Sequence, residues 1–196
     1  MILNWLLFLG TAVSYAACFR SEEGWSVKNG LAALRFYTLL SNLFCAAAAL
    51  AFALAARSGA VPHGIWLAKY VGTAAVTVTM ITVLVFLGPA LGYKSQLSGF
   101  GLWLHLIGPL LAIVSFCFFE RLYPLPLPLA LSGLLPVVLY GLVYLYKVVL
   151  CPEEKRWEDF YTFNRGGKWP ISFAAMLLGA FLISIVLRAA GMLRGA

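Results

Sequence analysis

Two residues of this sequence could together carry out acyl transfer: a histidine and a threonine that both lie in apolar segments. His105 lies in an apolar stretch between Gly101 and Pro109. An ionisable side chain at membrane depth is costly unless it has a partner or a function, so His105 is a candidate for a functional site. A neutral imidazole within hydrogen-bond reach of a hydroxyl can act as a general base and activate that hydroxyl as a nucleophile. The hydroxyl that the sequence favours is Thr38.

Thr38 has polar neighbours at helical spacing. Arg35 precedes it by three residues and Asn42 follows it by four, so one face of a helix would present all three. We expect Asn42, or a backbone N–H freed near Pro109, to stabilise the oxyanion, and Arg35 to hold a substrate carboxylate. Pro109 cannot donate to the carbonyl of His105, four residues earlier, so we expect the helix to bend there.

Two aromatic residues, Tyr37 and Trp103, would line a channel for the acyl chain, although aromatic side chains at this depth also serve as interfacial anchors. Each polar candidate has a structural interpretation as well. A membrane-embedded Thr or Asn commonly bonds a carbonyl or a neighbouring helix, and an Arg near a helix end extends to the interface. The group that would orient the histidine stays open, with Glu158, Asp159 and Asn164 of the last loop as candidates.

The elements that must position these residues follow from composition. The chain has 196 residues, of which 63% are hydrophobic and 11% charged, whereas a soluble domain has about a quarter charged residues. Apolar runs of about 17–25 residues predict membrane-spanning helices. We predict an all-α, polytopic membrane protein, a six-transmembrane-helix bundle that forms a single domain over residues 1–196. The expected spans are Ile2–Phe19, Leu31–Ala56, Trp66–Leu91, Gly101–Phe119, Pro126–Tyr146 and Pro170–Leu187.

With six alternating spans, the second and the fourth begin at the same membrane face. Thr38 is seven residues into the second span, and His105 is a similar distance beyond Ser98, where the fourth could begin. At about 1.5 Å per residue, both would lie roughly 10 Å below the same surface. The expected depth therefore permits the two side chains to meet.

Several classes of function are disfavoured by the same residues. The net charge of +7 is spread over loops and helix ends, which is typical of topology signals and unlike the clustered basic patch of a nucleic-acid-binding protein. The centres of the expected spans carry no Asp, Glu, Lys or Arg, which disfavours an ion-coupled transporter. His63 falls at the opposite face from His105, so the two cannot share a haem or a metal ion. We expect no cofactor and no metal, and membrane lipids as partners.

A family resemblance rests on two short motifs. The run from Arg35 to Thr38 resembles the basic-Phe-x-Thr element that opens the second helix of the androgen-induced gene 1 / androgen-dependent TFPI-regulating protein family, and His105 with Pro109 is similar to the His-x-x-x-Pro element of that family's fourth helix. The resemblance implies a multi-pass hydrolase of fatty acid esters of hydroxy fatty acids, with a Thr nucleophile and a His partner. The stretch Leu34–Asn42 also resembles bacterial relatives of that family. Short loops and abundant Ala indicate a bacterial inner membrane.

The resemblance has a departure. The family's Trp-x-Tyr-Pro-Phe element is reduced to the run from Trp169 to Phe173, which leaves the ester substrate open. The distribution of Lys and Arg favours termini outside the cell, whereas the resemblance implies cytosolic termini. The main alternative is a non-catalytic lipid-binding or scaffold protein of the same fold, and a small-molecule transporter is a third. Oligomeric state and biological role also stay open.

Overall fold

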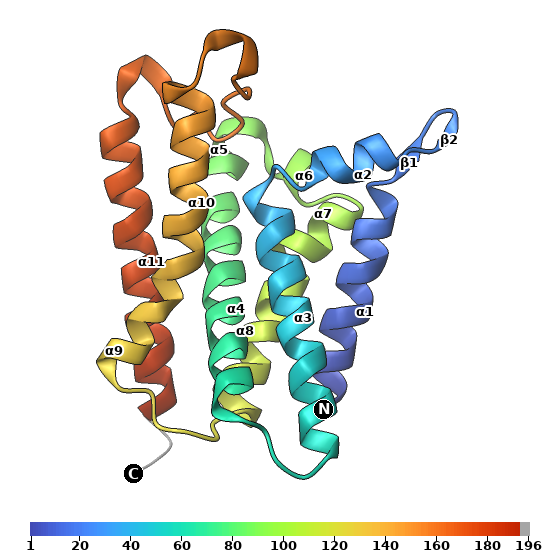
Figure 1. Cartoon of the computed structure of the whole chain (residues 1–196), viewed down its shortest axis with the longest axis vertical. Coiled ribbons are helices and arrows are strands. Elements are labelled where there is room, and N and C mark those ends of the chain that lie inside the picture. Colours follow the sequence, from blue (N-terminus) through green and yellow to red (C-terminus); the bar gives the residue numbers. More distant parts are fainter. Residues whose placement is uncertain (193–196) are drawn as a thin grey trace.

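Residues 1–192, described by a computed structural model, form helices packed side by side in one bundle (Figure 1). The last four residues of the expected domain, 193–196, lie outside the described residues. The helices are α1 Ile2–Ala17, α2 Val27–Ala33, α3 Tyr37–Arg57, α4 His63–Thr82, α5 Gly88–Leu91, α6 Tyr93–Gln96, α7 Phe100–Leu102, α8 Gly108–Phe119, α9 Leu127–Ala130, α10 Leu135–Leu145 and α11 Trp169–Met192. Two short strands, β1 Arg20–Ser21 and β2 Gly24–Trp25, pair antiparallel.

Within residues 1–192, five helical stretches are long and apolar enough to cross a membrane. They are Tyr37–Arg57, His63–Leu91, Phe100–Phe119, Leu127–Leu150 and Trp169–Ala190, and the shorter α1 is also apolar. The expectation of an all-α chain is confirmed, and the five stretches are compatible with an integral, multi-pass membrane protein. Length and composition support five spans, one fewer than expected.

The expected span Leu31–Ala56 is broken near its beginning. In Figure 1, α2 lies across the end of the bundle, and α3 begins only at Tyr37. Phe36, just before α3, has an extended backbone with φ −91° and ψ 131°. Tyrosines far along the chain bind the backbone groups that the break releases: the Tyr140 hydroxyl donates to the Arg35 carbonyl at 2.8 Å, and the Tyr161 hydroxyl accepts from the Tyr37 N–H at 3.1 Å.

The break changes where two candidate residues lie. Arg35 falls in the turn before α3, so it does not share a helix face with Asn42 as predicted. Thr38 lies in the first turn of α3 and not seven residues into a helix. The hydroxyl is therefore nearer the end of the bundle than the sequence indicated.

Three of the long helical stretches contain a π-helical turn just before a proline. The turns are Val83–Leu87, Trp103–Ile107 and Tyr146–Leu150, and the prolines are Pro89, Pro109 and Pro152. In a π turn each N–H bonds the carbonyl five residues earlier, so a proline leaves that carbonyl without a helical donor. The released carbonyls are those of Leu84, Leu104 and Lys147, and they accept instead from the Tyr93 hydroxyl at 2.8 Å, the Asn42 amide at 3.0 Å and the Trp157 N–H at 2.9 Å. The π turn before Pro109 thus releases the carbonyl of Leu104, one residue before the predicted His105.

A glycine allows α1 to pack closely on the π turn that carries His105. A Cβ atom at Gly10 would overlap the Trp103 ring, whose Nε1 donates to the Thr11 hydroxyl at 3.3 Å. We expect Gly10→Ala to destabilise the protein by about 1–3 kcal/mol through overpacking. Gly179→Ala is the matched control, because nothing lies within 4 Å of its added Cβ. The measurement is thermal unfolding in detergent, followed by circular dichroism. The unfolding midpoint should fall for Gly10→Ala and stay at the wild-type value for Gly179→Ala. Equal midpoints for the two variants would contradict the close packing of α1 on Trp103.

Candidate functional site

The side chain of Asn42 joins the two helices that carry Thr38 and His105. Its Nδ2 donates to the Thr38 carbonyl at 2.8 Å and to the Leu104 carbonyl at 3.0 Å, and the residue is 2% exposed. Leu104 directly precedes His105, so the first turn of α3 and the π turn Trp103–Ile107 lie side by side. An amide group has two N–H donors, and both are committed to carbonyls, which leaves none for an oxyanion.

A backbone carbonyl orients His105. Its Nδ1 lies 2.6 Å from the carbonyl oxygen of Gln96, the last residue of α6. A carbonyl oxygen can only accept, so Nδ1 carries the hydrogen, and in the neutral imidazole Nε2 is then the acceptor. This is the tautomer that a general base needs if it acts through Nε2. The candidate Asp159 has other partners, because its carboxylate accepts from the Tyr144 hydroxyl and from the backbone N–H groups of Phe163 and Asn164.

The hydroxyl of Tyr161 lies at the N-terminus of α3, next to Thr38. Burial raises the pKa of Tyr161, while hydrogen bonds with the Tyr37 backbone, the Thr38 side chain, Tyr140 and the Thr38 backbone act in the opposite direction. The phenol is neutral at pH 7, and its oxygen accepts from the N–H of Tyr37, the first residue of α3, which has no acceptor within the helix. Sequence reasoning missed this residue, which is one of several aromatic residues in its loop.

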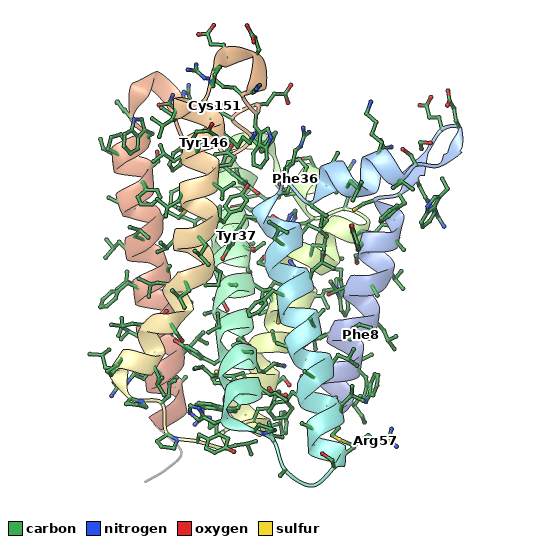
Figure 2. All side chains as sticks on the ribbon, viewed as in Figure 1. Phe8, Phe36, Tyr37, Arg57, Tyr146 and Cys151 are labelled. Carbon is green, nitrogen blue, oxygen red and sulfur yellow. The ribbon has the colours of Figure 1, made fainter. Side chains whose placement is uncertain are left out.

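The other predicted substrate-binding residues have structural contacts. The Arg35 guanidinium lies 4.8 Å from the ring centroid of Phe160 and 5.1 Å from that of Phe36, a cation–π arrangement. The Tyr37 hydroxyl donates to a carbonyl of α4, that of Ala75, at 3.4 Å. Figure 2 shows Phe36 and Tyr37 at the end of α3 opposite Arg57. Trp103 packs toward α1, as described above.

The helical segments that carry Thr38 and His105 are adjacent, but the two side chains are not hydrogen-bonded to each other. Within residues 1–192, no hydrogen bond joins the Thr38 side chain to the His105 ring. Both residues are partly buried. In the same described part of the chain, no three His, Cys, Asp or Glu side chains are grouped so that they could hold a metal ion.

A second polar cluster, which the sequence analysis missed, lies inside the bundle near the end that carries the N-terminus. Lys69 of α4 is 0% exposed; its Nζ lies 3.2 Å from Glu120 Oε2 and donates to Asn4 Oδ1 at 2.5 Å. Glu120 Oε1 accepts from Asn4 Nδ2 at 2.6 Å and from the Ser115 hydroxyl at 2.5 Å. The expectation that the basic residues serve as topology signals in loops and at helix ends is therefore wrong for Lys69. The sequence did contain a signal for this cluster, because Asn4, Lys69 and Glu120 all lie near the ends of expected spans at one face.

Comparisons of the chain with protein-family models, with curated proteins and with solved structures give no match. The site's chemistry therefore has to be argued from its own residues.

Proposed function

We propose that this protein is an intramembrane esterase that hydrolyses lipophilic carboxylic esters, such as fatty acid esters of hydroxy fatty acids. Thr38 is the nucleophile and His105 the general base. The observation that carries the proposal is the Asn42 side chain, which holds the Thr38 turn against the residue that precedes His105. In this proposal Asn42 is a positioning residue.

In the first half of the reaction, Nε2 of His105 takes the proton of the Thr38 hydroxyl as Oγ1 bonds to the ester carbonyl carbon. The carbonyl π electrons move to the oxygen and form a tetrahedral oxyanion. When this collapses, the bond to the alcohol oxygen breaks and the alcohol takes the proton from Nε2. The products at this stage are a free alcohol and an acylated Thr38.

In the second half, Nε2 takes a proton from a water molecule as the water oxygen attacks the acyl carbon. Collapse breaks the bond to Thr38 Oγ1, which regains a proton from Nε2, and the fatty acid leaves. Water has a short route to the site, because Thr38 lies in the first turn of α3 and not deep in the bundle.

The oxyanion needs donors, and the N-terminus of α3 can provide them. The backbone N–H of Tyr37 donates to the Tyr161 hydroxyl oxygen at 3.1 Å, and the Thr38 backbone lies close to the same oxygen. In the proposed complex the ester carbonyl oxygen takes the place of that hydroxyl. Backbone N–H groups at a helix N-terminus stabilise developing negative charge.

We further propose six spans and a bacterial inner membrane. The 16 residues of α1 extend about 24 Å, against a hydrocarbon core of about 30 Å, a mismatch that local thinning of the bilayer can accommodate. An even number of crossings returns both ends of the described chain to one face, the arrangement drawn in Figure 1.

The alternative is a non-catalytic lipid-binding protein of the same fold. One observation favours it: the Thr38 side chain lies beside the Tyr161 hydroxyl, and in residues 1–192 no hydrogen bond joins it to the His105 ring. In that case the polar groups around α3 would only fix the helix ends.

A fluorophosphonate probe on the purified full-length protein in detergent separates the two. We expect the wild-type protein to be labelled and Thr38→Val, which has nearly the same shape but no hydroxyl, to lose labelling. Ser95→Ala removes an exposed hydroxyl at the same end of the bundle and should stay labelled. Labelling of Thr38→Val would contradict the assigned nucleophile, and an unlabelled wild-type protein would favour the lipid-binding alternative.

A further inference from the structure

The segment between α1 and α3 exposes three large apolar side chains at the end of the bundle that carries Thr38. Trp25, Val27 and Leu31 have exposed fractions of 66%, 57% and 59%. They belong to the β1–β2 hairpin and to α2, which lies across that end of the bundle in Figure 1. Nothing in the proposed esterase mechanism uses them. Exposed apolar side chains grouped on one segment mark a surface that meets a membrane or another protein.

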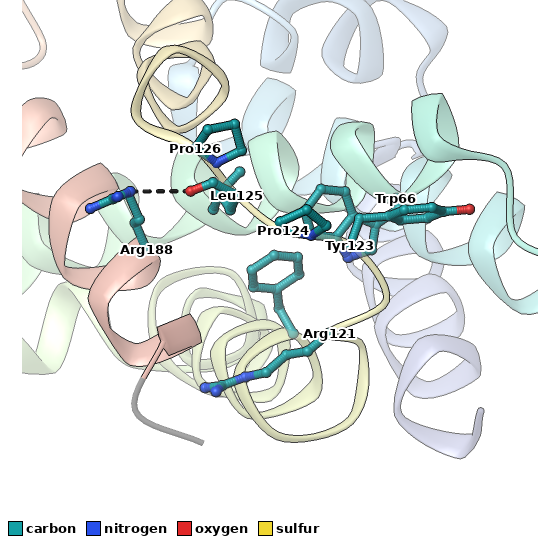
Figure 3. A pocket seen from close by; sticks show the side chains of 8 residues that line it. Trp66, Arg121, Tyr123, Pro124, Leu125, Pro126 and Arg188 are labelled. Carbon is teal, nitrogen blue, oxygen red and sulfur yellow. Dashed lines mark hydrogen bonds between the residues drawn. The ribbon is translucent and has the colours of Figure 1, made fainter. Parts of the chain in front are cut away.

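The connection between α8 and α9, at the opposite end of the bundle, is tied to the helices by its own residues (Figure 3). The Tyr123 ring packs against the buried Trp66, with ring centroids 5.4 Å apart. Nε of Arg188 donates to the Leu125 carbonyl at 3.1 Å, drawn as a dashed line in Figure 3. Within residues 1–192, the large apolar side chains of the hairpin and α2 have no comparable cover.

Trp25 is held in a fixed position despite its exposure. Its ring stacks on Phe19, with ring centroids 4.9 Å apart and planes inclined by 16°, and the Phe19 ring contacts Tyr15 of α1 edge-on at 5.1 Å. The Phe19 carbonyl accepts from the Ser26 N–H at 2.6 Å, and the Ser26 hydroxyl oxygen caps α2 by accepting from the Asn29 N–H at 3.3 Å. The exposed indole is therefore presented by a structured segment.

The short helix α2 has an apolar side that faces the end of α1. Val27 and Leu31 are four residues apart, so they share one side of the helix. Gly30 lies on the same side and packs on the Phe19 ring, which an added Cβ atom would overlap. At about 100° per residue, Asn29 lies on the opposite side, where a polar side chain is expected to meet water. The exposed apolar side chains of α2 are thus on the side that faces the bundle.

The level of this segment matches the edge of a bilayer. The helix α3 begins at Tyr37, next to α2, and its 21 residues extend about 32 Å, against a hydrocarbon core of about 30 Å. The helix α1 exposes a row of apolar side chains at helical spacing, as a lipid-facing helix requires: Ile2, Leu6, Leu9 and Val13. The lipid that covers this row would meet the hairpin and α2 where α1 ends.

We propose that the hairpin and α2 form a membrane-surface anchor that inserts Trp25, Val27 and Leu31 into the interfacial region of the bilayer. An amphipathic helix in the plane of the interface buries its apolar face at the boundary between headgroups and acyl chains. Tryptophan is enriched at this level because its ring is apolar and its N–H is polar. The anchor fixes the depth at which the chain turns into α3. It depends on the proposed membrane spans and is independent of the esterase activity.

The charges of this segment indicate which lipids it needs. Between Phe19 and Ala33 the basic residues are Arg20 and Lys28, and the acidic residues are Glu22 and Glu23. The formal charge of the segment is therefore zero, so its attraction to the interface comes from the apolar side chains and not from anionic headgroups. We expect the anchor to insert into a bilayer of zwitterionic lipid alone.

The test uses the full-length protein, labelled with fluorotryptophan and placed in phosphatidylcholine nanodiscs. In fluorine NMR, the signal that is missing from Trp25→Phe belongs to Trp25. Three paramagnetic agents are compared: a lipid with a nitroxide near its headgroup, a lipid with a nitroxide at the end of its acyl chain, and a water-soluble gadolinium chelate. The interface lies about 15 Å from the bilayer centre, so the headgroup nitroxide should cause the largest loss of the Trp25 signal.

A pair of variants on α2 tests the apolar side of that helix. Leu31→Gln should reduce the signal loss that the headgroup nitroxide causes at Trp25 and increase the loss caused by gadolinium, because a polar side chain weakens insertion. Lys28→Gln is the matched control and should behave as the wild-type protein does. Circular dichroism shows whether each variant is folded, and Val27→Gln replaces Leu31→Gln if the latter is not.

Four results would overturn the proposal. The largest loss with gadolinium would place the Trp25 ring in water. The largest loss with the chain-end nitroxide would place it in the hydrocarbon core. Little loss with any of the three agents would indicate that a second copy of the chain or a partner protein covers the ring. Equal effects of Leu31→Gln and Lys28→Gln would remove the apolar side of α2 from the contact.

Discussion

Lys69→Met should destabilise the protein by about 3–5 kcal/mol, since it leaves the carboxylate of Glu120 buried without its cationic partner. Both side chains are almost completely buried, with exposed fractions of 0% and 3%. Asn4 and Ser115 would still donate to Glu120, but neutral donors do not replace the lost positive charge. The expected result is a large fall in the free energy of unfolding, measured by denaturant titration in detergent.

The double variant Lys69→Met/Glu120→Gln separates the charge from the packing. The glutamine removes the unpaired charge and keeps an oxygen that can accept from Asn4 and Ser115. It should recover most of the lost stability, because replacing a whole buried ion pair is often nearly neutral. Lys28→Met, on an exposed lysine, should change the unfolding free energy by less than about 0.5 kcal/mol. A double variant no more stable than Lys69→Met would refute this account.

His105→Ala should lower kcat for hydrolysis of a lipophilic ester by about 10²–10⁴-fold, the usual contribution of a general base. The ester would still bind, so KM should change much less. The measurement is steady-state hydrolysis of a long-chain p-nitrophenyl ester by the purified protein in detergent.

Gln96→Ala is the control for this prediction. The backbone carbonyl of Gln96 is the group that contacts the imidazole, so the hydrogen bond survives removal of the side chain. This variant should keep the wild-type rate within about twofold, a change of less than about 0.5 kcal/mol in the barrier. Unchanged turnover in His105→Ala would remove the histidine from the mechanism.

The helices could be predicted because a long apolar run leaves the backbone few choices. A backbone in lipid must satisfy its polar groups internally, so each long apolar run is expected to be helical. From the alternation of spans, the sequence analysis placed Thr38 and His105 on helices that begin at one face of the bundle. In the structure, the Asn42 side chain links the two helical segments that carry these residues. The alternating direction of successive spans and the residue spacing along the chain were enough to select these two helices.

The break before α3 could not be predicted, because its cause lies far along the chain. The released groups at Arg35 and Tyr37 are bound by Tyr140 and Tyr161, more than a hundred residues away. The cluster around Lys69 was missed for the same reason. Only the packing of α1, α4 and α8 shows that Asn4 and Glu120 meet the lysine inside the bundle and not at the headgroups.

The π turn at Trp103–Ile107 makes the number of residues in this segment as important as their identity. An α-helix rotates about 100° per residue, so deleting one residue from the turn would restore ordinary helical register and swing everything on one side of it around the axis. The His105 ring would then turn away from the Gln96 carbonyl, and Asn42 would lose the Leu104 carbonyl that Pro109 releases. Evolution can therefore lengthen or shorten the loops of this protein much more freely than it can change the spacing between Gly101 and Pro109.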